Sequence, residues 1–151
     1  MHRLVASSFG LGLIPRRLWG SDSGAGTFGA ALAVGIGIFL LSVDAEWWVT
    51  LIIGSVAIGA SMWSARPFSD DGDPGWICMD ETAGTLVAMI GLGGIPWIAA
   101  VVVARVADIF KVLPGVTHAD RIHGPVGITF DDVIAGLYGL GVGWALTGLG
   151  V

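Results

Sequence analysis

The chain has little charge and almost no cysteine. Only 13% of its 151 residues are Asp, Glu, Lys or Arg, about half the share that soluble domains carry, which disfavours an ordinary water-soluble enzyme. The single cysteine, Cys78, excludes an intramolecular disulfide and makes a cysteine-built zinc site unexpected. Basic residues are also scarce, because seven Lys and Arg stand against twelve Asp and Glu, for a net charge of −5. An acidic chain lacks the basic face that nucleic acids require, so we expect no nucleic-acid partner.

Long uncharged stretches are what the chain does have, and 54% of it is hydrophobic. Four stretches contain no Asp, Glu, Lys or Arg: residues 28–43, 47–63, 82–104 and 133–151. A helix needs about 20 apolar residues to cross the roughly 30 Å core of a bilayer. A soluble all-helical domain is the alternative, but four such stretches leave it too little polar surface. We therefore predict an all-α fold, a compact polytopic membrane helical bundle in a single domain over 1–151, with a polar, interfacial segment at 1–25.

The predicted helices follow these stretches. We expect them at about 28–43, 46–63, 80–92, 96–112 and 131–148, joined by Pro-, Gly- and Asp-rich loops at 64–79 and 113–130. Trp47, Trp48 and Trp63 bracket the second stretch, as aromatic residues do at the two membrane interfaces. Ala135, Gly139 and Gly143 recur every four residues, a spacing that lets helix backbones approach closely in lipid.

The third stretch is not expected to be one straight spanning helix. Four helix-breaking residues interrupt it near its middle: Gly91, Gly93, Gly94 and Pro96. If it crossed the membrane, the seven Lys and Arg would divide almost evenly between the two sides, whereas if it enters and returns, all seven lie on one side. The positive-inside rule favours the second arrangement. We therefore predict a broken or re-entrant third segment, with residues 64–81 and 105–132 both on the cytoplasmic side.

Acidic residues gather next to the last two apolar stretches. Asp80 and Glu81 precede the third, and Asp131 and Asp132 open the fourth. Adjacent carboxylates repel one another, at a cost that grows in a low-dielectric setting. In one interpretation they mark helix N-termini, where the helix dipole favours negative charge. In the other they share a divalent cation, together with Asp73, and a set of oxygen ligands suits Mg²⁺.

Basic residues close to these acids favour the second interpretation. Arg105, Asp108 and Lys111 are spaced by three, which places them on neighbouring positions of one helical face. Cations beside paired carboxylates are the usual arrangement for a phosphate ester held next to Mg²⁺. Gly26 and Thr27 open the first apolar helix, where a helix N-terminus offers N–H groups to an anion. Together these residues indicate a phosphate-ester site at a membrane surface.

The same residues resemble the motifs of the bacterial phosphatidylglycerophosphatase A family, over about residues 20–140. The resemblance lies in Asp73-Pro74 with Asp80-Glu81 and Gly84, in Arg105 with Asp108 and Lys111, in Gly124–Gly127 with Asp131-Asp132, and in Gly26–Gly29. The chain departs from the family where K-P-x-P is usual, since Lys111 is followed by Val112 and only Pro114 is kept. Such changes affect loop stiffness and packing more than ionisable chemistry.

The resemblance implies a Mg²⁺-dependent phosphatase that hydrolyses phosphatidylglycerophosphate, a phospholipid in the bilayer, to phosphatidylglycerol and phosphate. It implies a multi-pass protein of the bacterial cytoplasmic (inner) membrane whose active site faces the cytoplasm. The expected metal ligands are Asp73, Asp80, Glu81, Asp131 and Asp132. The expected phosphate-binding residues are Arg105, Lys111, Gly26 and Thr27, with Asp108 orienting Arg105. Among all of these, the residues expected to be catalytic are Asp80, Asp132 and Arg105.

Two other functions remain open at this stage. A non-catalytic membrane assembly subunit would explain the hydropathy and the small residues, but not acids clustered near cations. A small ion-coupled transporter would use carboxylates within broken helices, yet the charges here lie at the ends of the apolar stretches. The two alternatives differ from a phosphatase in one simple respect, since neither releases phosphate from a lipid.

Overall fold

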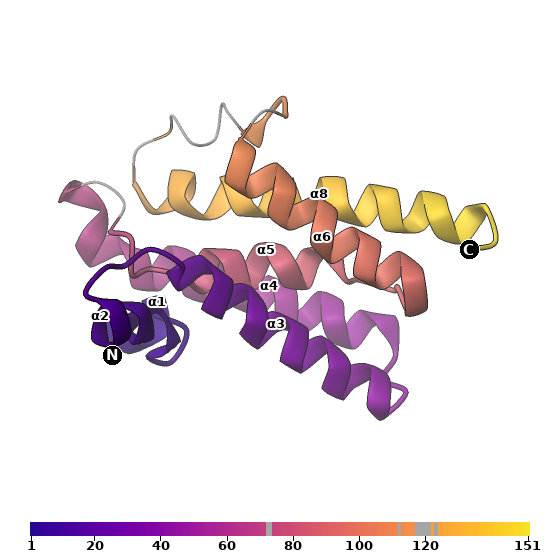
Figure 1. Ribbon diagram of the computed structural model, residues 1–151, viewed down its shortest axis with the longest axis horizontal. Coiled ribbons are helices and arrows are strands. Elements are labelled where there is room, and N and C mark those ends of the chain that lie inside the picture. Colours follow the sequence, from indigo (N-terminus) through magenta and orange to yellow (C-terminus); the bar gives the residue numbers. More distant parts are fainter. Residues whose placement is uncertain (72–73, 112, 117–121, 123) are drawn as a thin grey trace.

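The computed structural model describes residues 1–71, 74–111, 113–116, 122 and 124–151, and every regular element in these ranges is helical. Five longer helices build the bundle (Figure 1): α3 (Ala25–Ser42), α4 (Trp47–Ala65), α5 (Met79–Ala88), α6 (Gly94–Phe110) and α8 (Pro125–Gly148). The short elements that have described bounds are α1 (His2–Ala6), η1 (Leu11–Leu13), α2 (Ile14–Trp19) and η2 (Arg66–Asp71). The predicted all-α class is confirmed.

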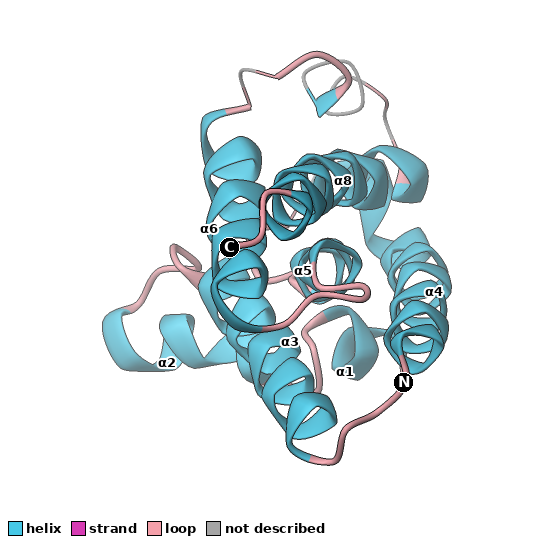
Figure 2. Ribbon diagram, turned by 90° about the vertical axis from the view of Figure 1, so that its right-hand side faces the viewer, coloured by secondary structure: helices cyan, strands magenta, loops and turns pink. Residues whose placement is uncertain are grey.

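The shortest of the five longer helices, α5, lies at the centre of the bundle (Figure 2) and packs against α3, α4, α6 and α8. Nine of its ten residues are buried, because small side chains let neighbouring helices come close. A Cβ added to Gly84 of α5 would collide with the backbone carbonyl of Asp132, and one added to Gly136 of α8 would collide with that of Gly84. The α5–α8 interface is therefore a backbone-to-backbone contact that only glycine permits.

The third apolar stretch forms a helical hairpin. Helix α5 ends at Ala88. The turn that follows contains Gly91 at φ 68°, and Gly94, the first residue of α6, has φ 59°, a left-handed conformation that favours glycine. Helix α6 then runs back, so α5 begins and α6 ends at the same end of the bundle (Figure 1). The prediction of a broken, returning third segment is confirmed.

Among the described residues, three helical segments are long and apolar enough to cross a membrane: Ala25–Ser42, Trp47–Phe68 and Pro125–Gly148. Their outward faces carry exposed large hydrophobic side chains, such as Ile38 and Phe39 on α3, Ile52 on α4 and Leu137 on α8. Apolar surface of this kind contacts lipid in a membrane protein. The chain is therefore a membrane protein with three candidate spans and a hairpin held between them.

Some predicted boundaries were wrong. Helix α8 begins at Pro125, within the predicted loop 113–130, because proline at the first helical position initiates a helix, and Gly124 precedes it at φ 94°. Asp131 and Asp132 consequently lie inside the helix instead of opening it. Helix α5 ends at Ala88, not near residue 92.

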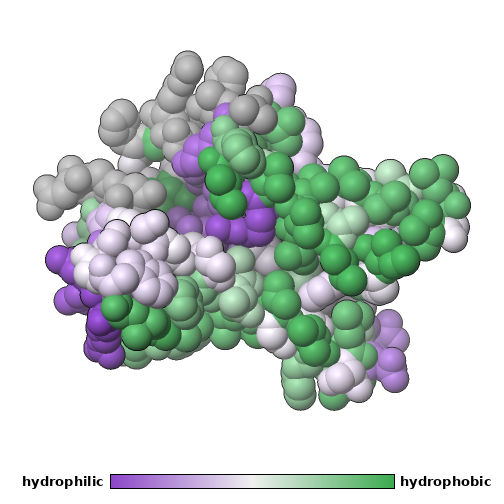
Figure 3. Space-filling model, in the orientation of Figure 1, coloured by the Kyte–Doolittle hydropathy of each residue, from purple (hydrophilic) through white to green (hydrophobic). Residues whose placement is uncertain are grey.

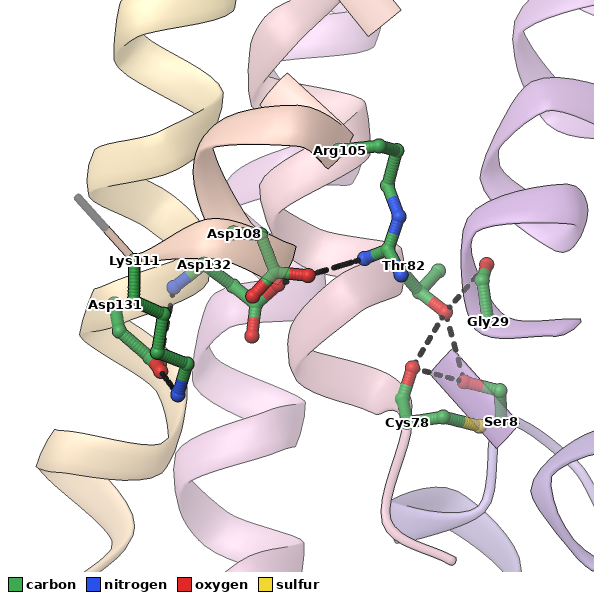
Figure 4. A network of polar contacts seen from close by, with 9 residues as sticks. All are labelled: Ser8, Gly29, Cys78, Thr82, Arg105, Asp108, Lys111, Asp131 and Asp132. Atoms are coloured by element: carbon green, nitrogen blue, oxygen red, sulfur yellow. Dashed lines mark hydrogen bonds and ion pairs between the residues drawn. The ribbon is translucent and has the colours of Figure 1, made fainter. Parts of the chain in front are cut away.

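The amino-terminal segment before α3 folds into α1, η1 and α2. It is tied to the start of α5: the Cys78 amide donates to the Ala6 carbonyl at 2.9 Å, and the Ser8 hydroxyl donates to the Cys78 carbonyl at 3.0 Å. Thr82 extends this link to α3, since its hydroxyl donates to the Gly29 carbonyl at 2.9 Å (Figure 4). These bonds hold the first turn of α5 in place.

Candidate active site

A cavity of about 420 Å³ opens at the end of the bundle where α3, α5 and α8 begin and α6 ends. Its walls come from all four helices and from the segment before α5. The lining residues are Ser23, Gly24, Gly26, Thr27, Gly75, Ile77, Asp80, Glu81, Arg105, Asp108, Ile109, Lys111, Asp131 and Asp132. Residues more than a hundred positions apart in the chain thus line the same polar cavity.

Carboxyl groups from three helices meet in this cavity. Asp80 and Glu81 come from the first turn of α5, Asp108 from the last turn of α6, and Asp131 and Asp132 from the second turn of α8. They form two groups that share Asp132: in each, one ligand oxygen per residue lies within 4.8 Å of the others, the first group with Asp80 and Glu81 and the second with Asp108 and Asp131. Asp80, Asp131 and Asp132 are each at most 6% exposed. Such groups have the spacing and the oxygen chemistry of a divalent-cation site.

Two cations are directed into the second of these groups (Figure 4). Arg105 Nη1 lies 2.8 Å from Asp108 Oδ2 and 3.9 Å from Asp132 Oδ1. Lys111 Nζ lies 2.8 Å from Asp131 Oδ2. The Asp131 carboxylate also accepts a hydrogen bond of 3.0 Å from the Asp132 amide. Asp108 and Asp131 therefore pair with the two cations at 2.8 Å, and Asp80 and Glu81 form the other group of carboxyls around Asp132.

Local backbone geometry directs these side chains. The Gly84–Gly136 contact between α5 and α8 brings Asp132 beside the first turn of α5. Lys111 ends α6 in a left-handed conformation, φ 48° and ψ 33°, and this break accompanies its approach to α8. A left-handed residue with a Cβ is strained by roughly 1–2 kcal/mol, and the ion pair with Asp131 offsets part of that cost.

The start of α3 forms the remaining wall. A Cβ added to Gly26 would collide with Glu81 Oε1 and lie 3.2 Å from Arg105 Nη2, so glycine leaves the room in which these two side chains meet. The Thr27 amide already donates to the Gly24 carbonyl at 3.0 Å, and it is thus engaged within its own turn.

Electrostatics in the cavity favour an added cation. Among the described lining residues, five carboxyl groups face the two cations Arg105 and Lys111. Glu81, which lies outside the three candidate spans, has its pKa raised well above the ordinary value, first by burial and then by the charges of Asp80 and Asp132. Its Oε2 atom is buried without a hydrogen-bond partner. A hard divalent cation would satisfy this oxygen and offset the excess negative charge.

Most of the site residues predicted from the sequence lie in this cavity. The structure brings together Asp80, Glu81, Asp131, Asp132, Arg105, Asp108, Lys111, Gly26 and Thr27. Asp73 lies outside the described residues. Sequence reasoning did not single out Ile109, which lies between Asp108 and Lys111 and lines the cavity, because one apolar residue in an apolar helix carries no signal. It also did not anticipate that Gly84 and Gly136 touch each other, although Gly84 belongs to one of the motifs named above.

Cys78 lies next to the cavity but takes no part in it. Burial raises the pKa of its thiol to about 11, and the side chain is fully buried. A thiol that stays protonated is neither a nucleophile nor a metal ligand at neutral pH. The site is therefore built from oxygen and cationic nitrogen groups.

Comparison with known proteins gives a family and several relatives. The family model described as Phosphatidylglycerophosphatase A matches residues 4–147. A "Putative phosphatidylinositol-3-phosphatase" of Bacteroides thetaiotaomicron is 32% identical over 145 residues, which cover 89% of this chain and 86% of the relative. "Phosphatidylglycerophosphatase A" of Escherichia coli is 27% identical, covering 92% and 79%, and that of Haemophilus influenzae is 26% identical, covering 95% and 86%. No solved structure gives a significant match.

Proposed function

This chain belongs to the phosphatidylglycerophosphatase A family of lipid phosphatases, and we propose that it removes the terminal phosphate of phosphatidylglycerophosphate in a Mg²⁺-dependent reaction. One observation carries the proposal: a buried cluster of carboxyl groups and two cations share one cavity at the end of a membrane helical bundle. The carboxyl groups suit a hard cation, and the cations suit a phosphate monoester. The apolar helices keep the lipid portion of the substrate in the bilayer.

The metal site that we propose centres on Asp80, Glu81 and Asp132. Their ligand oxygens lie within 4.8 Å of one another, and Glu81 brings the buried Oε2 atom that has no hydrogen-bond partner. Asp131 would join them if Lys111, now 2.8 Å away, turned toward the phosphate. Mg²⁺ held there would offset the negative charge on the phosphoryl oxygens.

Arg105 and Lys111 would bind the phosphoryl oxygens of the substrate that the metal does not contact. Asp108 holds Arg105 at 2.8 Å and so fixes the direction of the guanidinium group. Water then attacks phosphorus in line with the ester bond, the P–O bond breaks, and the lipid alcohol leaves with a proton. The two cations stabilise the charge that spreads over the phosphoryl oxygens during this step.

The expected test is phosphate release by the purified protein in detergent. We expect release from phosphatidylglycerophosphate with Mg²⁺, loss of release after chelation by EDTA, and recovery when Mg²⁺ is restored. Phosphatidylinositol 3-phosphate is the second candidate substrate, because a relative that is 32% identical bears the name of a phosphatase for it. Release that is insensitive to EDTA would contradict the metal proposal, and a preference for the inositol lipid would replace the substrate.

We further propose that the cavity faces the cytoplasm of a bacterial inner membrane. The described Lys and Arg residues lie at the cavity end of the bundle: Arg3, Arg16, Arg17, Arg66, Arg105 and Lys111. Asp44 and Glu46, in the turn between α3 and α4, lie at the other end. This asymmetry follows the positive-inside rule. Cysteines introduced at the exposed positions Ser21 and Ser42 should react with an impermeant reagent from the cytoplasmic and the external face, respectively, and the reverse pattern would contradict the orientation.

A further inference from the structure

Helix α6 carries an exposed apolar stripe that leads to the cavity. Its members, Ile98, Val102, Val106 and Ile109, recur every three or four residues and are between 50% and 64% exposed. Residues at this spacing lie on one face of a helix. We call these four residues the α6 stripe. At a rise of 1.5 Å per residue it is about 17 Å long, close to the roughly 15 Å hydrocarbon depth of one leaflet.

The α6 stripe is continuous with the polar cavity. Ile109 belongs to the stripe and also lines the cavity, between the neighbouring lining residues Asp108 and Lys111. Viewed from the side of the bundle, hydrophilic surface lies where α3 begins and α6 ends, directly beside the hydrophobic surface that follows α6 (Figure 3). The cavity is therefore reached from the flank of the bundle, at the place where an apolar track ends.

The other wall of this flank opening is the start of α3. Ser23, Gly24, Gly26 and Thr27 line the cavity there, and their small side chains leave room beside α6. Helix α3 packs mainly on α5, and α6 packs mainly on α8. Farther from the cavity the Trp97 side chain of α6 reaches across to α3, because a Cβ on Gly37 would lie 2.9 Å from its ring. The gap between α3 and α6 is thus lined by small residues at its polar end and bridged by the Trp97 ring farther along.

We propose that this gap is a lateral entrance through which a diacyl phospholipid with a terminal phosphate monoester reaches the site directly from the bilayer. The phosphate lies at Arg105 and Lys111, and one acyl chain runs along the α6 stripe. Charge complementarity supports this occupant, since the cations lie at the inner end of the gap and the stripe is apolar throughout. This inference rests on the proposed phosphatase activity. It adds the route by which the lipid enters the site and the surface that binds its acyl chain.

The test uses a bulky group placed on the α6 stripe, away from the cavity lining. Cys78 is fully buried, so a cysteine introduced by Val102→Cys, at a stripe position that is 55% exposed, can be labelled selectively with a large maleimide in the folded protein. The matched control is Ile95→Cys, which lies one turn beyond the stripe on the same helix and is 64% exposed. Each labelled variant is assayed on long-chain phosphatidylglycerophosphate and on a water-soluble analogue with two four-carbon chains.

We expect the label at position 102 to lower kcat/KM for the long-chain lipid by about tenfold or more, through lost binding of the chain, while the short-chain analogue, whose chains end before this position, is turned over as before. The label at position 95 should change neither substrate. An equal loss of kcat/KM on both substrates, or no loss of kcat/KM on the long-chain lipid, would overturn the proposal of a lateral entrance. A wild-type protein that releases phosphate from neither substrate would instead overturn the proposed function.

A second measurement does not depend on turnover. A phosphatidic acid probe with a photoreactive diazirine on one acyl chain is compared with the same probe built on phosphatidylcholine, both in detergent micelles with the wild-type protein. If the gap seats the chain of a phosphate monoester, crosslinks to Val106 and Ile109 should be several times more abundant with the phosphatidic acid probe. Equal crosslinking by the two probes would mean that α6 contacts only surrounding lipid, and would overturn the proposal.

Discussion

The two ends of the helical bundle differ in chemistry although α3 and α6 contribute to both. At one end, α3, α5, α6 and α8 enclose the polar cavity of about 420 Å³. At the other, α3, α4, α6 and the hairpin turn enclose a cavity of about 310 Å³ that none of the described charged residues lines, and to which Trp47 and Trp97 contribute. Cavity volume alone therefore does not mark an active site. The polar end differs because acidic and basic side chains near the helix termini line one cavity there.

Changing an acid at each end should give the largest contrast. We expect Asp132→Asn to lower phosphate release by at least about a thousandfold, because one proposed metal ligand and one partner of Arg105 are lost together. Asp44→Asn, at the opposite end, should leave the rate unchanged. Both rates are measured on phosphatidylglycerophosphate, with circular dichroism as the test of folding. Near-normal turnover by a folded Asp132→Asn protein would remove the functional difference between the two ends.

Changing a cation at the polar end should give the next largest effect. Lys111→Met removes the charge that lies 2.8 Å from Asp131, and we expect phosphate release to fall by about a hundredfold, as for loss of one transition-state donor. The control is Arg17→Met, which removes an exposed cation from the same end of the molecule but outside the cavity. Similar losses in both variants would show that general positive charge, and not the position of Lys111, matters.

Glycines that permit backbone contact should differ from glycines that face open space. Gly136→Ala places a methyl group against the Gly84 carbonyl, and we expect a loss of about 3 kcal/mol in the free energy of unfolding. Gly141→Ala, on the same helix, has nothing within 4 Å of the new Cβ and should be neutral or slightly stabilising. Thermal unfolding in detergent measures both. Equal midpoints of thermal unfolding for the two variants would show that the α5–α8 contact is less close than described.

The smallest effect is expected at Cys78, which borders the polar cavity without taking part in its chemistry. Because burial raises its pKa to about 11, the thiol stays protonated at pH 7.5, and the thiolate forms only when the pH approaches that value. We therefore expect no labelling of the folded protein by a maleimide at pH 7.5, and full labelling after denaturation. Rapid labelling of the folded protein would mean that this side of the cavity is open to water.

Much of the fold could be predicted because it depends on local sequence signals. Uncharged stretches predicted the long helices, and Gly91, Gly94 and Pro96 together with the distribution of cations predicted the returning hairpin. The start of α8 was misplaced, because Gly124-Pro125 is typical both of a loop and of a helix start. The folding of residues 1–25 depends on tertiary contacts, such as the bond from Cys78 to Ala6, which no local pattern reveals.

The sequence predicted which residues form the candidate site better than it predicted how those residues are arranged. Spacing and family motifs identified the acids and the cations, and the structure places them in one cavity. The pairing of Arg105 with Asp108 was expected from the sequence and is present at 2.8 Å. The pairing of Lys111 with Asp131 could not be predicted, because it depends on the left-handed end of α6 at Lys111 and on the Gly84–Gly136 contact. The sequence therefore did not distinguish Asp131, which pairs with Lys111, from Asp80, which lies in the other carboxylate group.

The most direct test of the account is whether the acidic cluster binds a hard divalent cation. Mn²⁺, a spectroscopic substitute for Mg²⁺, is titrated into the purified protein and followed by electron paramagnetic resonance. We expect saturable binding that Mg²⁺ displaces, that Asp80→Asn and Asp132→Asn abolish, and that Asp44→Asn preserves. Binding of equal strength in all of these variants, or no saturable binding in the wild-type protein, would contradict the account.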